Sequence, residues 1–299
     1  MKSRSFAAIG VLGLIALAGC SAPADTSSQS ASPSAASSAD CSNGALPTVT
    51  QGSLTVATDK PAYPPYFEDD DPSNGKGFES AVAYAVAGKL GYATEDVTWV
   101  TEPFNKSYAP GEKDFDFDIN QISITPKRAQ AVDFSEGYYT VNQAVVALNN
   151  SSIANATTID ELKKAKLGAQ VGTTSLDFIN EVVKPDTAPM VYNDTNDAKS
   201  ALEAGQIDGI VVDLPTAYYV TAAEFKDAKI VGQFAPDGSG EQFGLLMEKG
   251  SSIKSCVDWA LNELKDSGEL QQLQDQWLAG ENAPYFESQN GASSSPTSS

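Results

Sequence analysis

The sequence predicts an α/β protein made of two lobes, and three observations carry that prediction. Between residues 46 and 286, strand-like apolar runs alternate with helix-like segments, a pattern typical of sheets whose strands are mostly parallel. Hydrophobic residues make up 41% of the chain, which is enough for real cores. The 299 residues have room for two domains of ordinary size. That length favours two lobes over a single sheet.

The alternation gives the expected elements in chain order. Apolar residues at positions 78, 82, 85, 86 and 90 share one face, and Gly91 ends that helix. The same reading of periodicity predicts strands at residues 53–58, 97–101, 115–124, 139–148, 166–171, 190–193, 209–213, 229–234 and 242–248. It predicts helices at residues 78–91, 160–165, 174–183, 195–205, 252–266 and 269–278.

The first residues of the chain have the pattern of an export signal. Lys2 and Arg4 precede 13 apolar or glycine residues at 6–18, a run shorter than the roughly 20 residues of a membrane-spanning helix. The following Leu-Ala-Gly-Cys resembles a bacterial lipobox, so we expect a signal peptide at 1–19 and lipidation of Cys20. The alternative is an ordinary signal peptide with an incidental cysteine. A two-chain lipid anchor would hold the mature protein on the outer face of the cell membrane.

Two polar segments flank the predicted folded part. Residues 21–45 are mostly Ser, Ala, Thr and Pro, which cannot bury enough surface to fold. We therefore expect 20–45 to be the lipidated cysteine and a disordered tether, and 287–299 to be a disordered tail.

Composition excludes several classes of function. Asp and Glu outnumber Lys and Arg by 39 to 19, giving a net charge of −20, which disfavours binding to nucleic acid through a basic surface. The chain has no histidine, so Ser-His-Asp catalysis and histidine metal sites are excluded. Its three cysteines are too scattered for a four-cysteine metal site. We expect no metal and no cofactor.

Polar residues gather where four predicted strands end. The segments are 58–66, 120–128, 171–175 and 211–215, and they contain an arginine, a glycine and hydroxyl-rich helix start, and a carboxylate. Ligands of α/β folds bind beyond the carboxyl ends of strands, and a helix start with free N–H groups accepts anions. An arginine fork, such N–H groups and a separate carboxylate together match a zwitterion.

This set resembles the family-3 extracellular solute-binding proteins, the polar amino-acid receptors of ABC importers, over about residues 52–278. The motifs are ISITPKRAQAVDFSEGYY (122–139), GAQVGTTS (168–175), AGQIDGIVVDLPTAYY (204–219), GFESAVAYAVAGKLG (77–91) and ELKDSGELQQLQDQW (263–277). The resemblance implies a type II periplasmic-binding-protein-like fold with two crossover hinge strands and a ligand cleft between lobes. Lobe 1 would be 46–142 plus 241–286, and lobe 2 would be 143–240.

The same resemblance implies residue roles. Arg128 would pair with the α-carboxylate of the ligand, assisted by Ser123 and the backbone N–H of Thr174, and Asp213 would take the α-ammonium. Tyr63 or Tyr66, with Phe104, would sandwich the ligand side chain, and Asp59 would lie near its end. The full set of expected ligand-binding residues is Asp59, Tyr63, Tyr66, Phe104, Asn120, Gln121, Ser123, Arg128, Gly172, Thr173, Thr174 and Asp213.

Some residues depart from the family pattern. Asn120 and Gln121 stand where small residues are usual, Asp118 where an apolar residue is usual, and Glu79 replaces an aspartate. One interpretation of the alternating acids before Asn120 is that Asp118 and Asn120 line the pocket. The other is a solvated strand edge and turn. The acidic run 68–71 lacks the spacing of a calcium loop, so we expect a solvated loop.

An exported chain favours pairing of the two remaining cysteines, Cys41 and Cys256. The alternative is two free thiols.

The resemblance favours a binding protein without chemistry that captures an amino acid and hands it to a membrane permease. Because Asp59, and with it Asp118, stands where the ligand side chain ends, we expect a neutral or cationic polar amino acid. Lys60 lies beside Asp59, and its positive charge would oppose this preference. The alternatives are a dehydratase-like enzyme on the same scaffold and an amino-acid-sensing lipoprotein. We expect a monomer.

Overall fold

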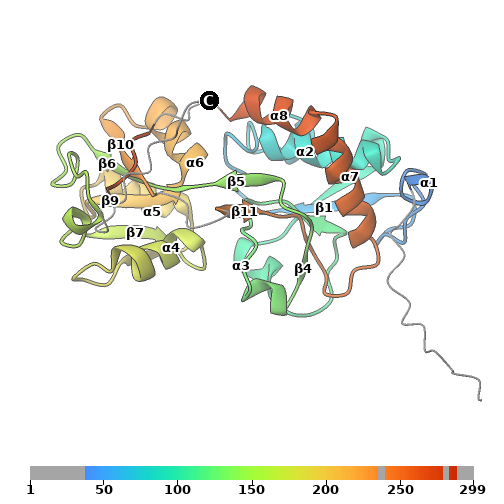
Figure 1. Ribbon diagram of the computed structural model, residues 1–299, viewed down its shortest axis with the longest axis horizontal. Coiled ribbons are helices and arrows are strands. Elements are labelled where there is room, and N and C mark those ends of the chain that lie inside the picture. The colour runs from blue at the N-terminus through green and yellow to red at the C-terminus, as the bar shows by residue number, and fades with distance from the viewer. Residues whose placement is uncertain (1–37, 235–239, 279–282, 288–299) are drawn as a thin grey trace, which may run out of the picture. The chain divides into compact units, whose positions relative to one another are not determined.

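The computed structural model describes residues 38–234, 240–278 and 283–287, all within one compact unit of the chain. The strands form two five-stranded sheets, one in each lobe, and a two-stranded sheet that connects them (Figure 1). The predicted α/β class with two lobes is confirmed. Residues 1–19 and Cys20, on which the signal-peptide and lipidation predictions depend, lie outside the described residues.

Lobe 1 is built on a mixed sheet. Its strand order is β2 (Val97–Thr101), β1 (Leu54–Thr58), β3 (Phe117–Asp118), β12 (Leu246–Met247) and β4 (Asp133–Phe134). The first three strands are mutually parallel, whereas β12 runs antiparallel to β3 and to β4. The sheet therefore contains more antiparallel pairs than the sequence predicted.

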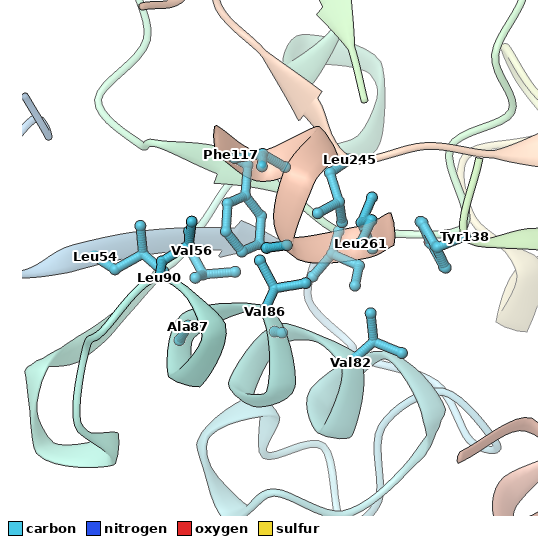
Figure 2. Close-up of a cluster of buried hydrophobic side chains, with 14 of the residues drawn as sticks. Leu54, Val56, Val82, Val86, Ala87, Leu90, Phe117, Tyr138, Leu245 and Leu261 are labelled. Carbon is cyan, nitrogen blue, oxygen red and sulfur yellow. The ribbon is translucent and has the colours of Figure 1, made fainter. Parts of the chain in front are cut away.

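Helices cover the lobe 1 sheet. They are α1 (Ser38–Cys41), η1 (Pro72–Asn74), α2 (Phe78–Lys89), η2 (Thr94–Asp96), α3 (Phe104–Ser107), η3 (Arg128–Gln130), α7 (Lys254–Asp266) and α8 (Glu269–Trp277). Figure 2 shows the core between α2 and the sheet, where Val86 from the helix approaches Val56 and Phe117 from the strands, and Val82 lies farther along the helix in the same cluster. Leu261 of α7 joins the same cluster. This core holds the strand ends that carry the site.

Lobe 2 has a second mixed sheet with the order β10 (Ala228–Gln233), β6 (Gln143–Leu148), β9 (Gly209–Asp213), β7 (Leu167–Gln170) and β8 (Met190–Tyr192). The strands β9, β7 and β8 are parallel, and β6 is antiparallel to both of its neighbours. Its helical segments are η4 (Ile159–Leu162), α4 (Thr174–Phe178), η5 (Ile179–Val183), α5 (Thr195–Glu203), α6 (Leu214–Tyr219) and η6 (Val220–Glu224). Of these, α6 and η6 were not predicted.

The strands β5 (Tyr139–Val141) and β11 (Glu241–Phe243) pair antiparallel and connect the lobes. The predicted strand 139–148 is therefore two strands, which separate at Asn142 where the chain leaves the linking sheet for β6. The predicted strand 242–248 is likewise divided between β11 and β12. The linking strands β5 and β11 belong to the two-stranded sheet, whereas β6 belongs to the lobe 2 sheet and β12 to the lobe 1 sheet. Each predicted strand is therefore interrupted where the chain passes from one sheet to the next.

Two other predicted elements differ from the structure. Of the strand expected at 115–124, only Phe117–Asp118 pairs within the lobe 1 sheet, and Ser123 makes an isolated antiparallel bridge to Phe243. Between them Gln121 has a left-handed φ of 48° that turns the chain out of the sheet. The helix expected at 174–183 begins as α4 and continues as a π-helical turn, η5, which ends at Lys184 with φ 52°.

The ordered domain starts before the predicted boundary at residue 46. Residues 38–41 form α1, and Cys41 is fully buried in the lobe 1 core. A disulfide joins Cys41 to Cys256 in α7, with an S–S distance of 2.09 Å, which is the pairing that the sequence favoured. Gly91, at φ 84°, lets the carbonyl oxygen of Ser42 approach where a Cβ would otherwise stand. The disulfide and a hydrogen bond from the N–H of Gly44 to the carbonyl oxygen of Leu90 at 3.0 Å attach this segment to lobe 1.

Residues 283–287 pack on lobe 2, whereas the predicted boundary 241–286 had assigned them to lobe 1. The structure leaves lobe 1 at the end of α8, and residues 283–287 lie against β10 through the bridge between Gln233 and Tyr285. Phe286 is buried in the lobe 2 core, where its ring lies 5.1 Å from that of Phe234. No helix of the described residues is both long enough and apolar enough to cross a membrane.

Candidate ligand-binding site

A pocket of about 820 Å³, counting its open mouth, lies between residues of the two lobes. Ten of the twelve expected ligand-binding residues line it: Asp59, Tyr63, Phe104, Asn120, Gln121, Ser123, Arg128, Thr173, Thr174 and Asp213. Most of the lining comes from the ends of β1, β3, β7 and β9 and the segments that follow them, as the strand-end argument predicted, and the rest from α3 and α5.

Arg128 is the buried cation of this pocket, with 7% of its surface exposed. Its Nη1 donates to the carbonyl oxygen of Ser123 at 2.8 Å, and its Nη2 donates to that of Gly172 at 2.9 Å. The rings of Tyr108 and Phe104 lie 4.8 Å and 5.4 Å from the guanidinium carbon. Burial lowers the pKa of Arg128, yet a guanidinium stays charged in proteins.

No carboxylate among the described residues lies within 4.0 Å of Arg128. Two carbonyl oxygens occupy only two of the five N–H donors of the guanidinium. A buried cation without an acidic partner is costly. The pocket is therefore suited to an anionic group.

Gly172 does not line the pocket but holds the second lobe close to Arg128. Its φ is 76°, and a Cβ at this position would collide with the side-chain oxygens of Asn105 and Tyr108. Glycine is the residue that permits both the left-handed backbone and this approach. Next to it, Thr173 caps α4 by accepting a hydrogen bond from the backbone N–H of Leu176 at 3.2 Å.

Asp213, at the end of β9, is the carboxylate on the opposite wall. It is half-buried and lines the pocket. Its Oδ1 accepts a hydrogen bond from Nε2 of Gln143 at 2.6 Å. Burial raises the pKa of Asp213 well above its usual range, and the negative charge of Glu241 raises it further. An added positive charge would lower that pKa, so this wall is suited to a cationic group.

The aromatic loop after β1 contributes one of the two candidate tyrosines. Tyr63 lines the pocket, and Nζ of Lys199 lies 5.6 Å from the centre of its ring. Tyr66 is fully buried and packs edge-on against Phe243 at 6.3 Å, so it belongs to the core. Of the two tyrosines that the sequence left as alternatives, Tyr63 lines the pocket and Tyr66 does not.

Asp59 is held in place by backbone donors. Its Oδ1 accepts from the N–H of Lys60 at 2.7 Å, and its Oδ2 accepts from the N–H of Phe104 at 3.2 Å. The second bond ties the end of β1 to α3, which carries an aromatic ring of the pocket. Both residues are thereby positioned together.

Gln121 connects the pocket to a buried acid. The backbone N–H of Gln121 donates to Oε1 of Glu79 at 2.7 Å, and its side-chain Nε2 donates to Oε2 of the same carboxylate. The hydroxyl of Tyr138 also donates to Glu79. Burial raises the pKa of Glu79 to about 7, although these hydrogen bonds lower it. Glu79 does not line the pocket, so its contact with the site runs through Gln121.

Neither interpretation of Asp118, as a pocket residue or as part of a solvated strand edge, is correct. It pairs with Ala57 in the register of β3 on β1, is fully buried, and does not line the pocket. Within the described residues neither carboxylate oxygen has a hydrogen-bond partner, and burial raises its pKa well above the usual range. Ser107 lies nearby and lowers that pKa, but its hydroxyl donates to the carbonyl of Phe104. Asn120, two residues on, does line the pocket.

Several residues of the lining were missed. They are Pro64, Gln170, Ser175, Thr195, Lys199, Val211, Val212, Thr216, Tyr219, Val220 and Glu224. Lys199 and Glu224 form an ion pair at 2.6 Å, and no local sequence pattern distinguishes them from surface charges. Recognition of α6 as a helix would have found Thr216 and Tyr219, which lie three positions apart in it.

Two carboxylates of the acidic run 68–71 make contacts with residues nearby in the sequence. Asp71 caps η1, and Asp70 accepts from the N–H of Ala62 at 2.7 Å and pairs with Lys60 at 3.4 Å. In the described residues no three His, Cys, Asp or Glu side chains gather as a metal site requires.

Comparisons with known proteins give consistent matches. The profile of the bacterial extracellular solute-binding proteins, family 3, matches residues 54–280. The arginine-binding extracellular protein ArtP of Bacillus subtilis (strain 168) is 28% identical over 225 residues, covering 72% of this chain and 82% of ArtP. The ABC transporter glutamine-binding protein GlnH of the same organism is 26% identical over 213 residues, covering 70% of this chain and 75% of GlnH.

One solved structure extends these matches to three dimensions. An ancestral arginine-binding protein bound to arginine is similar with a TM-score of 0.65 and 30% identity, over 77% of this chain and 99% of that chain.

Proposed function

The chain belongs to the bacterial extracellular solute-binding proteins, family 3, and we propose that it binds a neutral or cationic polar amino acid between its lobes. The relatives are amino-acid-binding extracellular proteins, and the resemblance expected from the sequence is confirmed. One observation carries the proposal. Arg128 and Asp213 line the same pocket, and neither has an oppositely charged side chain within 4.0 Å in the described part of the chain.

An α-amino acid supplies both missing charges at once. Its carboxylate fits the N–H groups of Arg128 that the two carbonyl oxygens leave unused, because guanidinium binds carboxylate in a planar fork. Its ammonium fits Asp213 on the opposite wall. A ligand with only one of the two charges would leave the other buried group uncompensated.

Ligand binding and lobe closure are coupled in this proposal. Arg128 belongs to lobe 1 and contacts Gly172 of lobe 2, and Asp213 belongs to lobe 2. An amino acid that contacts both residues stabilises the arrangement in which the lobes approach, because binding favours the state with which the ligand makes more contacts. We further propose that the closed form delivers the ligand to the permease of an ABC importer, as the name of the relative GlnH suggests.

The side-chain end of the pocket favours a neutral or cationic ligand. Asp59 has no Lys or Arg nitrogen within 4.0 Å in the described residues, whereas Lys199 is already paired with Glu224. Two relatives are named for arginine and for glutamine, which are cationic and neutral, respectively. A carboxylate side chain would meet the unpaired charge of Asp59.

Thermal shift with all twenty amino acids tests the binding function, followed by calorimetric competition among arginine, glutamine and glutamate. A tight ligand raises Tm by mass action. We expect arginine or glutamine to raise Tm and to displace glutamate. A panel in which no amino acid shifts Tm contradicts the proposed function. Glutamate binding about tenfold more tightly than both others contradicts only the assignment of the side-chain end.

We propose binding without chemistry. A dehydratase-like reaction needs a general acid or base that reaches the substrate, and Glu79, whose pKa is near neutrality, is separated from the pocket by Gln121. Recovery of the ligand unchanged after prolonged incubation supports this proposal, and appearance of a dehydrated product would support the enzyme. A sensing role is the outcome if the bound ligand is never transferred to a permease.

The membrane anchor remains a proposal that rests on the sequence of the first twenty residues. Cys20→Ser removes the thiol that would be lipidated, so we expect the protein to move from the membrane fraction to the soluble fraction. Ligand affinity should not change, because every pocket residue lies beyond position 58.

Ser21→Ala is the matched control for this change, since it alters the neighbouring residue and leaves the cysteine. Fractionation of the exported protein is the measurement. A Cys20→Ser protein that stays with the membrane would rule out the lipobox.

A further inference from the structure

Glu241, the first residue of the linking strand β11, lies behind the pocket wall and contacts both lobes. Its Oε1 accepts hydrogen bonds from the hydroxyls of Ser123 in lobe 1 and Thr174 in lobe 2. Both hydroxyls belong to residues that line the pocket, whereas Glu241 does not line it. The carboxylate is therefore one side chain removed from the ligand.

Glu241 and Asp213 share one hydrogen-bond donor. Nε2 of Gln143 lies 2.6 Å from Oδ1 of Asp213 and 3.1 Å from Oε2 of Glu241. The other end of the same amide accepts a hydrogen bond from the hydroxyl of Ser175 at 2.6 Å, which fixes the nitrogen toward the acids. Gln143 is 1% exposed. Two half-buried carboxylates thus converge on a single buried, neutral donor.

Positive charge is scarce around this pair. Across the described residues, no Lys or Arg nitrogen lies within 4.0 Å of either carboxylate. The titratable groups that face Asp213 are Glu241 of β11, Glu79 of α2, the phenol of Tyr66 and, as the cation among them, Arg128 of η3. Two negative charges that share one donor disfavour the state in which both are ionised.

We propose that Asp213 and Glu241 hold one proton in common in the empty pocket, and that the α-ammonium of a bound amino acid takes its place. The proton leaves for solvent, so the charge of the pair changes from minus one to minus two as the ligand brings one positive charge. Glu241 is then a positioning residue that acts through Asp213. The inference rests on the proposed amino-acid binding and adds the chemistry of its ammonium subsite.

The direction of the pH effect follows. Burial and Glu241 raise the pKa of Asp213 in the empty protein, and a neighbouring ammonium lowers it again. The bound state therefore carries fewer protons than the empty state. Affinity falls as the pH falls through the pKa of the empty pair, by up to about tenfold for each pH unit.

Calorimetric titration measures the released proton directly. The ligand is L-arginine, or the amino acid that gives the largest thermal shift if arginine gives none. Titrations in two buffers of different ionisation enthalpy, from about pH 5 to about pH 7.5, keep the ligand ammonium protonated throughout. We expect release of up to about one proton by the wild-type protein, because one proton is shared.

Glu241→Gln removes the negative charge of this side chain while keeping its size and shape. The amide keeps an oxygen that accepts from Ser123 and Thr174 but carries no charge, so the pKa of Asp213 should drop. We expect the fall in affinity to move to lower pH and the proton release at a given pH to decrease. Glu136→Gln is the matched control, because it removes an equal charge from an exposed position in lobe 1, and it should behave like the wild type.

The possible outcomes are distinct. Amino-acid binding with no proton release and with the same pH dependence in the wild type and Glu241→Gln overturns the shared proton while leaving the proposed function intact. Absence of binding to any amino acid overturns the proposed function. Carboxyl carbon NMR of the empty protein then still tests the pair, because Asp213 should titrate above its usual range and at lower pH in Glu241→Gln. Titration of Asp213 in its usual range overturns the proposal.

Discussion

Replacement of Arg128 by alanine is expected to abolish amino-acid binding. The change removes the forked charge-assisted hydrogen bonds to the ligand carboxylate, each worth about 1.5–3 kcal/mol. Loss of two such bonds weakens binding by roughly a hundredfold to ten-thousandfold. It also removes the hydrogen bonds to the carbonyl oxygens of Ser123 and Gly172, so the approach of lobe 2 to lobe 1 loses a direct contact.

Calorimetry with the amino acid found by thermal shift measures this effect, and circular dichroism checks that the fold persists. Lys127→Ala is the matched control, because Lys127 is an exposed cation one position away. We expect its affinity to match that of the wild type. Unchanged affinity in Arg128→Ala would remove the central element of the proposed site.

Loss of the Cys41–Cys256 disulfide is expected to destabilise the protein strongly. The bond closes a loop with a sequence separation of 215 residues, and restriction of so long a loop in the unfolded chain contributes up to roughly 5 kcal/mol. The double variant Cys41→Ser with Cys256→Ser should therefore unfold at a lower denaturant concentration. Residues 38–45 should also exchange their amide hydrogens faster, because the disulfide is what ties α1 to α7.

Denaturant titration of the variant and the wild type, both carrying Cys20→Ser, gives the difference in unfolding free energy. Because both proteins lack Cys20, no third thiol is present that could form another disulfide. Intact mass before and after reduction should differ by two protons in the parent protein and by none in the variant. Equal unfolding free energies would contradict a stabilising role for the bond.

The architecture and the charged ends of the site were predictable because they lie in local patterns. Asp59, Asp213 and the segment from Asn120 to Arg128 each follow an apolar strand, and parallel strands bring their carboxyl ends together at one edge of a sheet. The antiparallel strand β4 was not predictable in the same way. It contains two residues, which is too short for any periodicity.

The misplacement of Asp118 has a physical cause. Alternation along residues 114–118 predicts two faces of a strand, but it does not say which face is covered. In the structure the face of Asp118 and Ala57 is covered by α3 and its neighbours, and the left-handed φ of Gln121 then turns the chain so that the following residues reach the pocket. Burial by a distant segment is not encoded in the strand itself.

Glu241 escaped prediction for a related reason. It stands in the linking strand, more than 60 residues from Thr174 and more than 110 from Ser123. Its neighbours in sequence carry no motif of ligand binding. Its place in the site depends on how β11 pairs with β5 and brings the start of the strand between the lobes, which is a property of the tertiary fold.

The short segment 283–287 places the two ends of the described chain on different lobes. The described residues begin in lobe 1, where Cys41 is tied to α7, and they end on lobe 2, where Phe286 is buried beside Phe234. A chain that crossed between the lobes only through β5 and β11 would begin and end in the same lobe. Because it crosses once more after α8, a pair of fluorophores placed at residues 40 and 287 would be carried by opposite lobes. Their energy transfer would report opening and closing without any label inside the pocket.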